Sequence, residues 1–189
     1  METYAGFLEH TDAQVGRLTS ALRQRGQLDN TLFIYIAGDN GSSAEGGLEG
    51  SINYMGALQG MPETLEQQLA ALDRIGDETT YPQYPAGWGW ALTSPFQWVK
   101  QVASHLGGTR VGAVVSWPRV MGEQAGGLRS QFTHVNDVVP TILDALAIGA
   151  PETVRGVAQR PMDGSSFLAS LSQDDAPEHH PTQLFEVNG

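Results

Sequence analysis

Cysteine is absent from this sequence of 189 residues, and lysine occurs once, as Lys100. Without cysteine the chain can form neither a disulfide nor a thiolate metal site, and it has no cysteine nucleophile. Charged residues make up only 16% of the chain, below the roughly 25% of an average domain. The 21 acids and 10 bases give a net charge of −11, which argues against a nucleic-acid partner.

Long apolar runs are also missing. No stretch approaches the roughly 18 apolar residues of a membrane-spanning helix, so we expect none. We expect no signal peptide within these residues, because no basic and apolar leader precedes the first amphipathic segment. This leaves the localisation open. Hydrophobic residues at 40% and a mean hydropathy of −0.23 predict one globular domain with a hydrophobic core. The 23 glycines and 10 prolines predict many loops.

The order of the expected elements is that of an α/β fold. Residues 31–37 are apolar on both faces, which is typical of a strand in a parallel sheet covered by helices. We expect residues 42–86 to be an excursion from that sheet and residues 150–182 to be loop. The expected helices are 3–25, 62–75, a helix that starts at Ser94 and Pro95 and carries Lys100, and 138–148 capped by Asp137; the other expected strands are 111–117 and 182–187.

Gly38-Asp39-Asn40-Gly41 follows directly after the first expected strand. Open α/β sheets bind ligands at the carboxyl ends of their strands. The side-chain oxygens of Asp39 and Asn40 are hard donors that suit Ca²⁺ or Mg²⁺. The alternative is strong: Asp-Asn-Gly is also ordinary turn chemistry, because these residues tolerate left-handed backbone geometry.

Lys100 and the histidines are the other candidates for chemistry. A lysine ammonium is a compact charge that can meet an anionic oxygen, although most lysines are simply solvated. His105 and His134 could each donate a proton or bind a ligand, or could be hydrogen-bonded structural residues. His10 lies on the first expected helix with nothing to organise it, and the pair His179 and His180 in an acidic loop suggests at most adventitious metal binding.

The sequence also contains an aromatic run, and it lacks two catalytic motifs. The run could line a substrate pocket or belong to the core. The chain contains neither a Gly-x-Ser-x-Gly nucleophile elbow nor a phosphate-binding P-loop motif. The run consists of Trp88, Trp90, Phe96 and Trp98.

Five blocks of sequence, in order, carry a family resemblance. The first block has a helix pattern with Val-Gly-Arg-Leu before a strand that ends in Asp-Asn-Gly, in the string YAGFLEHTDAQVGRLTSALRQRGQLDNTLFIYIAGDNG. The second block has a lysine ahead of Gly-Gly-x-Arg, in the string PFQWVKQVASHLGGTRVGAVVSWP. HVNDVVPTILDAL, GVAQRPMDGSSFLASL and TQLFEVNG follow. Together they resemble the sulfatases, and bacterial arylsulfatases in particular, within the alkaline-phosphatase-like superfamily. The resemblance implies an α/β fold with a mostly parallel sheet flanked by helices.

The resemblance also implies roles for matching residues. Asp39 and Asn40 would be two oxygen ligands of a catalytic divalent cation, usually Ca²⁺, with Mg²⁺ as the alternative. Lys100 would contact the sulfate group of a small-molecule sulfate ester and neutralise charge on its oxygens. His105 lies in the same block and is a candidate for substrate binding, with no catalytic role carried onto it. The family's reaction is sulfate-ester hydrolysis.

The sequence departs from that family in its nucleophile. The family uses a formylglycine made from Cys or Ser in a Cys/Ser-x-Pro-x-Arg motif, which is absent here; the nearest match, Ser116-Trp-Pro-Arg-Val120, places arginine one position too early. The family's paired N-terminal aspartates and its upstream Lys and His are absent too. We therefore expect residues 1–189 to be an internal part of a sulfatase catalytic domain, inactive alone, in which 150–189 lead toward a missing C-terminal part.

Two other readings stay open. One is a phosphoric ester hydrolase of the same superfamily, although the usual Asp-x-x-x-His metal-binding pair is missing from residues 38–45. The other is a catalytically dead fragment or a binding module. The native substrate cannot be read from residues 42–86, which we expect to shape the substrate pocket.

Overall fold

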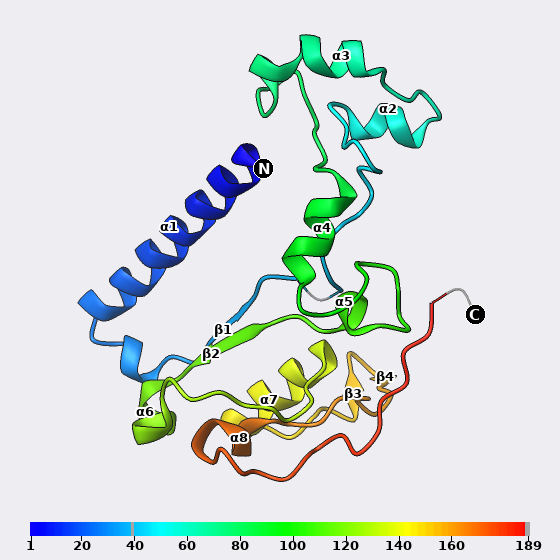
Figure 1. The fold of residues 1–189 in the computed structure, drawn as a ribbon. Coiled ribbons are helices and arrows are strands. Elements are labelled where there is room, and N and C mark those ends of the chain that lie inside the picture. Colours follow the sequence, from blue (N-terminus) through cyan, green and yellow to red (C-terminus); the bar gives the residue numbers. More distant parts are fainter. Residues whose placement is uncertain (39, 188–189) are drawn as a thin grey trace. The chain divides into compact units, whose positions relative to one another are not determined.

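The computed structural model describes residues 1–38 and 40–187, and its helices and strands confirm the expected α/β content (Figure 1). β1 (Phe33–Ile36) and β2 (Ala113–Ser116) form one two-stranded sheet, and β3 (Thr153–Val154) pairs antiparallel with β4 (Val157–Ala158). The helices are α1 (Glu2–Gln24), α2 (Tyr54–Leu58), α3 (Leu65–Ala70), α4 (Ala86–Thr93), α5 (Leu106–Thr109), α6 (Pro118–Met121), α7 (Val138–Ala145) and α8 (Leu168–Ser172). Short 3-10 turns lie at Leu28–Asn30, Leu72–Arg74, Gly122–Gln124 and Val135–Asp137.

The chain divides into two compact units. Unit 1 comprises 1–20, 36–112 and the residues from Phe185 onward. Unit 2 comprises 21–35 and 113–184. The expected loop of residues 38–41 and Lys100 therefore fall in unit 1, whereas β2, α7 and α8 fall in unit 2.

The first helix forms where its apolar periodicity predicts it. α1 ends at Gln24, and Gly26 follows with φ +65°, a left-handed conformation that suits a glycine just past a helix end. The amide of Gln27 donates to the carbonyl of Leu22. The apolar stripe itself stays open to solvent: Phe7 is 74% exposed and α1 has no buried residue.

The prediction of a helix from Ser94 onward is wrong. α4 ends at Thr93, and the chain from Ser94 to His105 is irregular. Trp98 and Gln101 take left-handed φ values of 67° and 76°, which no α-helix accommodates. The Thr93 hydroxyl donates to the Trp98 carbonyl over 2.9 Å and holds this turn. Lys100 is therefore a loop residue.

The prediction of a strand over 182–187 is also wrong, because residues 181–187 have no regular structure. The loop expected over 150–182 contains a hairpin and α8. Arg155 and Gly156 take φ values of 50° and 80° between β3 and β4, as a two-residue hairpin turn requires. The helix expected over 62–75 is shorter and covers Leu65–Ala70. It begins after a capping box, in which the side chain of Thr64 accepts the amide of Gln67 and the side chain of Gln67 accepts the amide of Thr64.

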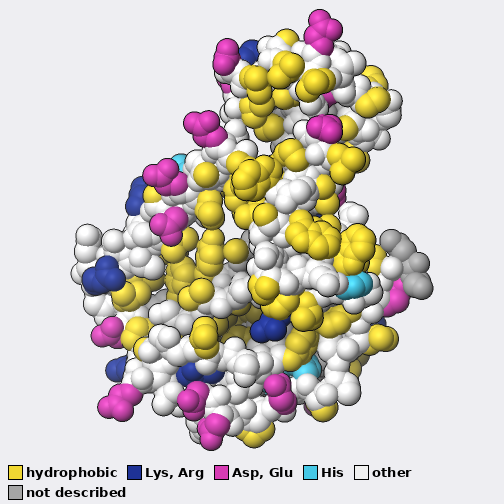
Figure 2. Space-filling model, viewed as in Figure 1, with side chains coloured by type: hydrophobic (Ala, Val, Ile, Leu, Met, Phe, Trp, Pro, Cys, Tyr) yellow, Lys and Arg dark blue, Asp and Glu magenta, His cyan; other side chains and the backbone are white. Residues whose placement is uncertain are grey.

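The hydrophobic core is smaller than the composition led us to expect. Figure 2 shows hydrophobic side chains spread over the face in view, and many large ones are exposed. None of the helices in the described part of the chain is both long and apolar enough to cross a membrane. The buried hydrophobic residues are Ala71, Val99, Phe167, Leu171 and Ala176.

A buried carboxylate, Asp137, organises unit 2. Its side chain is 0% exposed and accepts the amides of His134 over 2.7 Å and Ser165 over 2.8 Å. The His180 ring lies 2.7 Å from the same carboxylate. Burial by itself raises the pKa of Asp137, but the hydrogen bonds from His134, Ser165 and His180 outweigh it, and the pKa lies below its usual value.

Thr141 extends this polar centre along α7. Its hydroxyl is fully buried, donates to the Asp137 carbonyl over 2.7 Å and accepts the amide of Phe167 over 3.0 Å. Phe167 directly precedes α8. Hydrogen bonds, rather than apolar packing alone, therefore hold α7 and α8 together.

Asp137→Ala should destabilise the chain strongly. The substitution leaves the partly buried amides of His134 and Ser165 without acceptors, at about 1–3 kcal/mol each, so we expect a loss of about 3 kcal/mol or more. Urea denaturation measures it. Asp144→Ala is the matched control on α7, because that exposed carboxylate accepts the Ser166 hydroxyl and no other donor among the described residues. This substitution should cost about 1 kcal/mol. Equal losses in the two variants would contradict the role given to Asp137.

Candidate functional site

A close contact between backbones brings the loop after β1 to Lys100. Gly41 takes φ +84°, and a Cβ atom at this position would collide with the carbonyl of Gly107 and approach the amide of Lys100. The amide of Lys100 donates to the carbonyl of Ser42 over 2.9 Å. Residues 41–42 thus lie directly against residues 100 and 107, although 59 positions separate Gly41 from Lys100 in the chain (100 − 41).

The glycine pair 107–108 serves the same close packing. Both residues are buried at the start of α5. A Cβ atom on Gly107 would collide with the carbonyl of Trp98, and one on Gly108 with the carbonyl of Val102. The absence of side chains lets the loop around Lys100 fold back onto α5.

The Lys100 ammonium is paired with Glu45. Nζ lies 3.2 Å from each carboxylate oxygen of Glu45, and the two side chains are 30% and 24% exposed. The Ser43 hydroxyl donates to Glu45 over 3.0 Å, and the Gln101 side-chain amide donates over 3.2 Å. Lys100 is thus a positioned cation with an acidic partner, not a freely solvated side chain.

Glu45 was missed by the sequence analysis. It lies 55 residues from Lys100, and no motif marks it among the chain's many acids. Only the folding of residues 41–45 against the Lys100 loop makes it a partner.

The expected cation ligands are described only in part. Asn40 is exposed and directly precedes Gly41, next to the contact with Lys100 and Gly107. Asp39 lies outside the described residues. The structure therefore brings the neighbourhood of Asn40 and the backbone of Lys100 together.

His105 belongs to an aromatic cluster in unit 1. Its ring lies 5.8 Å from that of Trp98, which lies 5.7 Å from that of Trp90. The Ser104 hydroxyl is 2.9 Å from Nδ1 of His105. Trp90 and Trp98 are 47% and 46% exposed, so these two form a partly open aromatic surface and not a buried core.

The remaining residues of the aromatic run and the other histidines lie elsewhere. Phe96 packs under the Arg110 guanidinium at 5.1 Å, and Trp88 is half exposed. His134 has a structural role, because its Nδ1 accepts the amide of Asn136 over 3.3 Å at the start of a 3-10 turn. His10 is exposed on α1.

Tyr84 borders the Lys100 loop. Burial raises the pKa of its hydroxyl above the usual value; hydrogen bonds with Ser43 and Ser42 and the charge of Lys100 oppose this only partly. The ring meets that of Tyr4 edge-on at 5.6 Å. A neutral phenol is therefore held beside the residues that surround Lys100.

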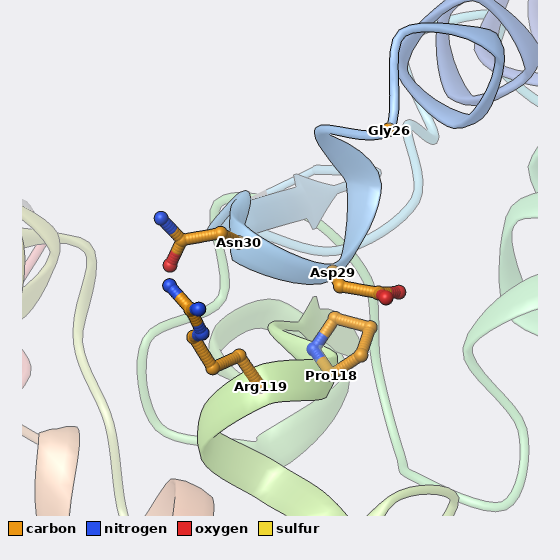
Figure 3. A pocket seen from close by; sticks show the side chains of 5 residues that line it. All are labelled: Gly26, Asp29, Asn30, Pro118 and Arg119. Carbon is orange, nitrogen blue, oxygen red and sulfur yellow. The ribbon is translucent and has the colours of Figure 1, made fainter.

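A separate shallow pocket in unit 2 contains none of the expected site residues. Figure 3 shows the Arg119 side chain pointing toward the Asn30 amide, with the Asp29 carboxylate turned away from both. Gly26 and Pro118 complete the lining. The pocket lacks converging nucleophiles or ligands, and we assign it no chemistry.

Gly41→Ala should cost markedly more stability than Gly47→Ala. Both glycines have positive φ values, +84° and +68°, so each variant pays a backbone penalty of about 1–2 kcal/mol. Only at Gly41 does the new Cβ atom also meet the backbone of Gly107, since Gly47 has open space around it. We expect an extra loss of about 2 kcal/mol, measured by denaturant unfolding. Similar losses in both variants would show that the close contact is not tight.

Tyr84 should ionise above the ordinary tyrosine range. Its raised pKa means that its contribution to stability is complete below the unfolded pKa of about 10 and is lost as pH rises through the folded value. Spectrophotometric titration of Tyr84→Phe against the wild type isolates this hydroxyl. Tyr81→Phe is the control, because Tyr81 is 58% exposed. Identical ionisation of the two tyrosines would refute the assignment.

Comparison with known proteins places the chain in a family. The family model described as Sulfatase matches residues 1–148. An uncharacterized sulfatase of Schizosaccharomyces pombe is 28% identical over 151 residues, covering 80% of this chain and 26% of that protein. An arylsulfatase of Klebsiella aerogenes is 25% identical over 169 residues, covering 89% of this chain and 34% of that protein. The chain thus spans about a quarter to a third of the length of these relatives, and it belongs to the sulfatase family.

Proposed function

We propose that this chain contributes the cation-binding loop and the substrate lysine of a sulfuric ester hydrolase of the arylsulfatase type. The observation that carries the proposal is the close contact at Gly41, which puts the Asn40 loop against the backbone of Lys100. A cation ligand and an anion-binding ammonium are needed together in a site that handles a sulfate ester. Membership of the sulfatase family supports this reading.

The donor set after β1 fits a hard divalent cation. Asn40 offers an amide oxygen on an exposed loop, and Asp39 would add a carboxylate. Oxygen donors of this kind suit Ca²⁺, with Mg²⁺ as the alternative. Such a cation would act as a Lewis acid toward a sulfate oxygen.

Lys100 would bind a second region of the sulfate group. The backbone amide of Lys100 donates to the carbonyl of Ser42, two residues after Asn40, and Glu45 holds the ammonium and balances its charge in the free protein. A sulfate oxygen would take over part of that charge when the ester binds. His105 and the exposed faces of Trp90 and Trp98 would border the organic part of the ester, since their rings form one cluster that includes two residues of the Lys100 loop segment.

The wider architecture follows from the same proposal. We infer a mostly parallel sheet of the alkaline-phosphatase-like type, to which β1 and β2 belong, within a catalytic domain of which residues 1–189 are a part. Residues 42–86 are then the excursion beside the site, and 150–189 lead toward the C-terminal part. The formylglycine nucleophile would come from outside these residues, since the chain lacks the Cys/Ser-x-Pro-x-Arg motif.

Lys100→Ala in the full-length protein tests the proposal. We expect kcat/KM for a small aryl sulfate to fall by about 10²–10³-fold, the range for removing one charge-stabilising group, while the fold is retained. The control is Arg110→Ala, which removes a nearby cation that packs on Phe96 and should change the rate little.

A matched aryl phosphate is assayed in parallel. Faster turnover of the phosphate than of the sulfate would indicate a phosphoric ester hydrolase instead. No turnover of either ester by the full-length protein would favour a catalytically dead or binding role.

A further inference from the structure

Three potential metal ligands converge in unit 2, outside the proposed sulfate site. The carboxylate of Asp137 and the Nε2 atoms of His179 and His180 lie within 4.8 Å of one another. Nε2 of His180 is 2.7 and 2.8 Å from the two carboxylate oxygens, and Nε2 of His179 is 3.5 Å from Oδ2. Both histidine side chains are only 13% exposed, and Asp137 is fully buried.

His179 is the residue that a purely structural role leaves unexplained. Its Nε2 is buried and makes no hydrogen bond among the described residues, while it lies 3.5 Å from Oδ2 of Asp137. An unsatisfied buried nitrogen costs free energy. A cation between this nitrogen and the carboxylate would remove that cost.

The carboxylate retains lone pairs for a metal. Oδ1 accepts the amide of Ser165 and Oδ2 accepts that of His134. Each carboxylate oxygen offers about two acceptor sites. The amides use one on each oxygen. Among the described residues only Nε2 of His180 hydrogen-bonds to the side that remains, and a metal would bridge this nitrogen to the carboxylate. The two amides would then orient the carboxylate, in the way that neighbouring hydrogen bonds orient metal ligands.

The histidine segment is anchored by unit 2 itself. The Gln131 side chain donates to the carbonyls of Asp174 and Ala176, each over 2.9 Å, and the amide of Phe132 donates to Glu178 over 2.9 Å. The rings of His180 and Phe132 meet edge-on at 5.7 Å. The two histidines therefore approach Asp137 on a fixed segment and not on a free tail.

The donor set selects the metal. Imidazole nitrogens suit Zn²⁺ and similar transition metals, whereas Ca²⁺ and Mg²⁺ prefer oxygen. Bonds of about 2.0–2.1 Å in a tetrahedral site separate two donor atoms by about 3.3 Å, and the present separations from Oδ2 of 2.8 and 3.5 Å bracket that value. Two histidines and one carboxylate with an open fourth position form a recognised zinc ligand set.

We propose that Asp137, His179 and His180 form a binding site for one Zn²⁺ ion, separate from the cation site after β1. Zn²⁺ would take the place of the proton between His180 and Asp137, and that proton would move to Nδ1 of His180 or to solvent. A water molecule would fill the fourth position. The site would join the loop of residues 174–180 to the start of α7.

Zinc titration of the 189-residue chain against a chromophoric zinc indicator tests the proposal. The informative variant is His179→Gln, because it removes the free nitrogen and keeps the His180–Asp137 hydrogen bond on which folding depends. We expect one Zn²⁺ per wild-type chain and at least about 100-fold weaker binding in the variant, since loss of a mere supporting group already costs 10–100-fold. His10→Gln, on the exposed face of α1, should bind as the wild type does.

Thermal unfolding and competition with Ca²⁺ provide two further tests of the site. Zinc should raise the melting temperature of the wild type and of His10→Gln but not of His179→Gln, and a large excess of Ca²⁺ should not displace it. If His179→Gln fails to fold by circular dichroism, Co²⁺ substitution of the wild type decides, because histidine ligation produces characteristic visible absorption. Equal zinc binding by His179→Gln, or none by the wild type, overturns the site. Neither result depends on sulfate-ester turnover, so this test is independent of the proposed function.

Discussion

The candidate sulfate site depends on close contact between backbone segments, which requires glycine at positions 41, 107 and 108. At each of these positions a Cβ atom would collide with a backbone carbonyl. Because the side chains are absent, three backbone segments can lie in contact and exchange hydrogen bonds such as that from Lys100 to Ser42. The site is therefore positioned by main-chain contacts, which hold a loop more rigidly than flexible side chains would.

The pairing of the Lys100 ammonium with Glu45 is a consequence of that packing. An ammonium that is largely shielded from water needs an anionic or polar partner, and the same loop provides Glu45, which Ser43 and Gln101 hold in place. This arrangement suits a binding lysine, because the cation is kept in one place and its partner can share it with an incoming anion. The nearby phenol of Tyr84 stays neutral and adds no competing charge.

Unit 2 is held together largely by hydrogen bonds to buried polar side chains. Its centre contains a carboxylate and a hydroxyl where most domains would bury only apolar side chains. Asp137 and Thr141 accept hydrogen bonds from the amides of Ser165 and Phe167, just before α8, and the His180 ring contacts the Asp137 carboxylate; each bond is directional. The arrangement gives the loop of 174–180 a definite place although few hydrophobic residues are buried around it.

Local patterns in the sequence were enough for α1, for the strands β1 and β2, for α7 and for the family. The predicted cap of α7 by Asp137 is wrong, because that carboxylate accepts the amides of His134 and Ser165 instead. Periodicity, capping residues and ordered motifs are properties of neighbouring residues, so they can be read without a structure. The Ser-Pro pair at 94–95 wrongly predicted a helix start. Trp98 and Gln101 take left-handed conformations in a loop that is held by tertiary contacts with α4 and Gly107. Likewise, only the tertiary structure made Glu45 the partner of Lys100. It also brought His179 and His180, for which the sequence suggested no more than adventitious metal binding, to Asp137 over 40 residues away. Such partners are chosen by burial and by the shared need of buried polar groups for hydrogen bonds or ions, and those needs arise only when distant segments meet.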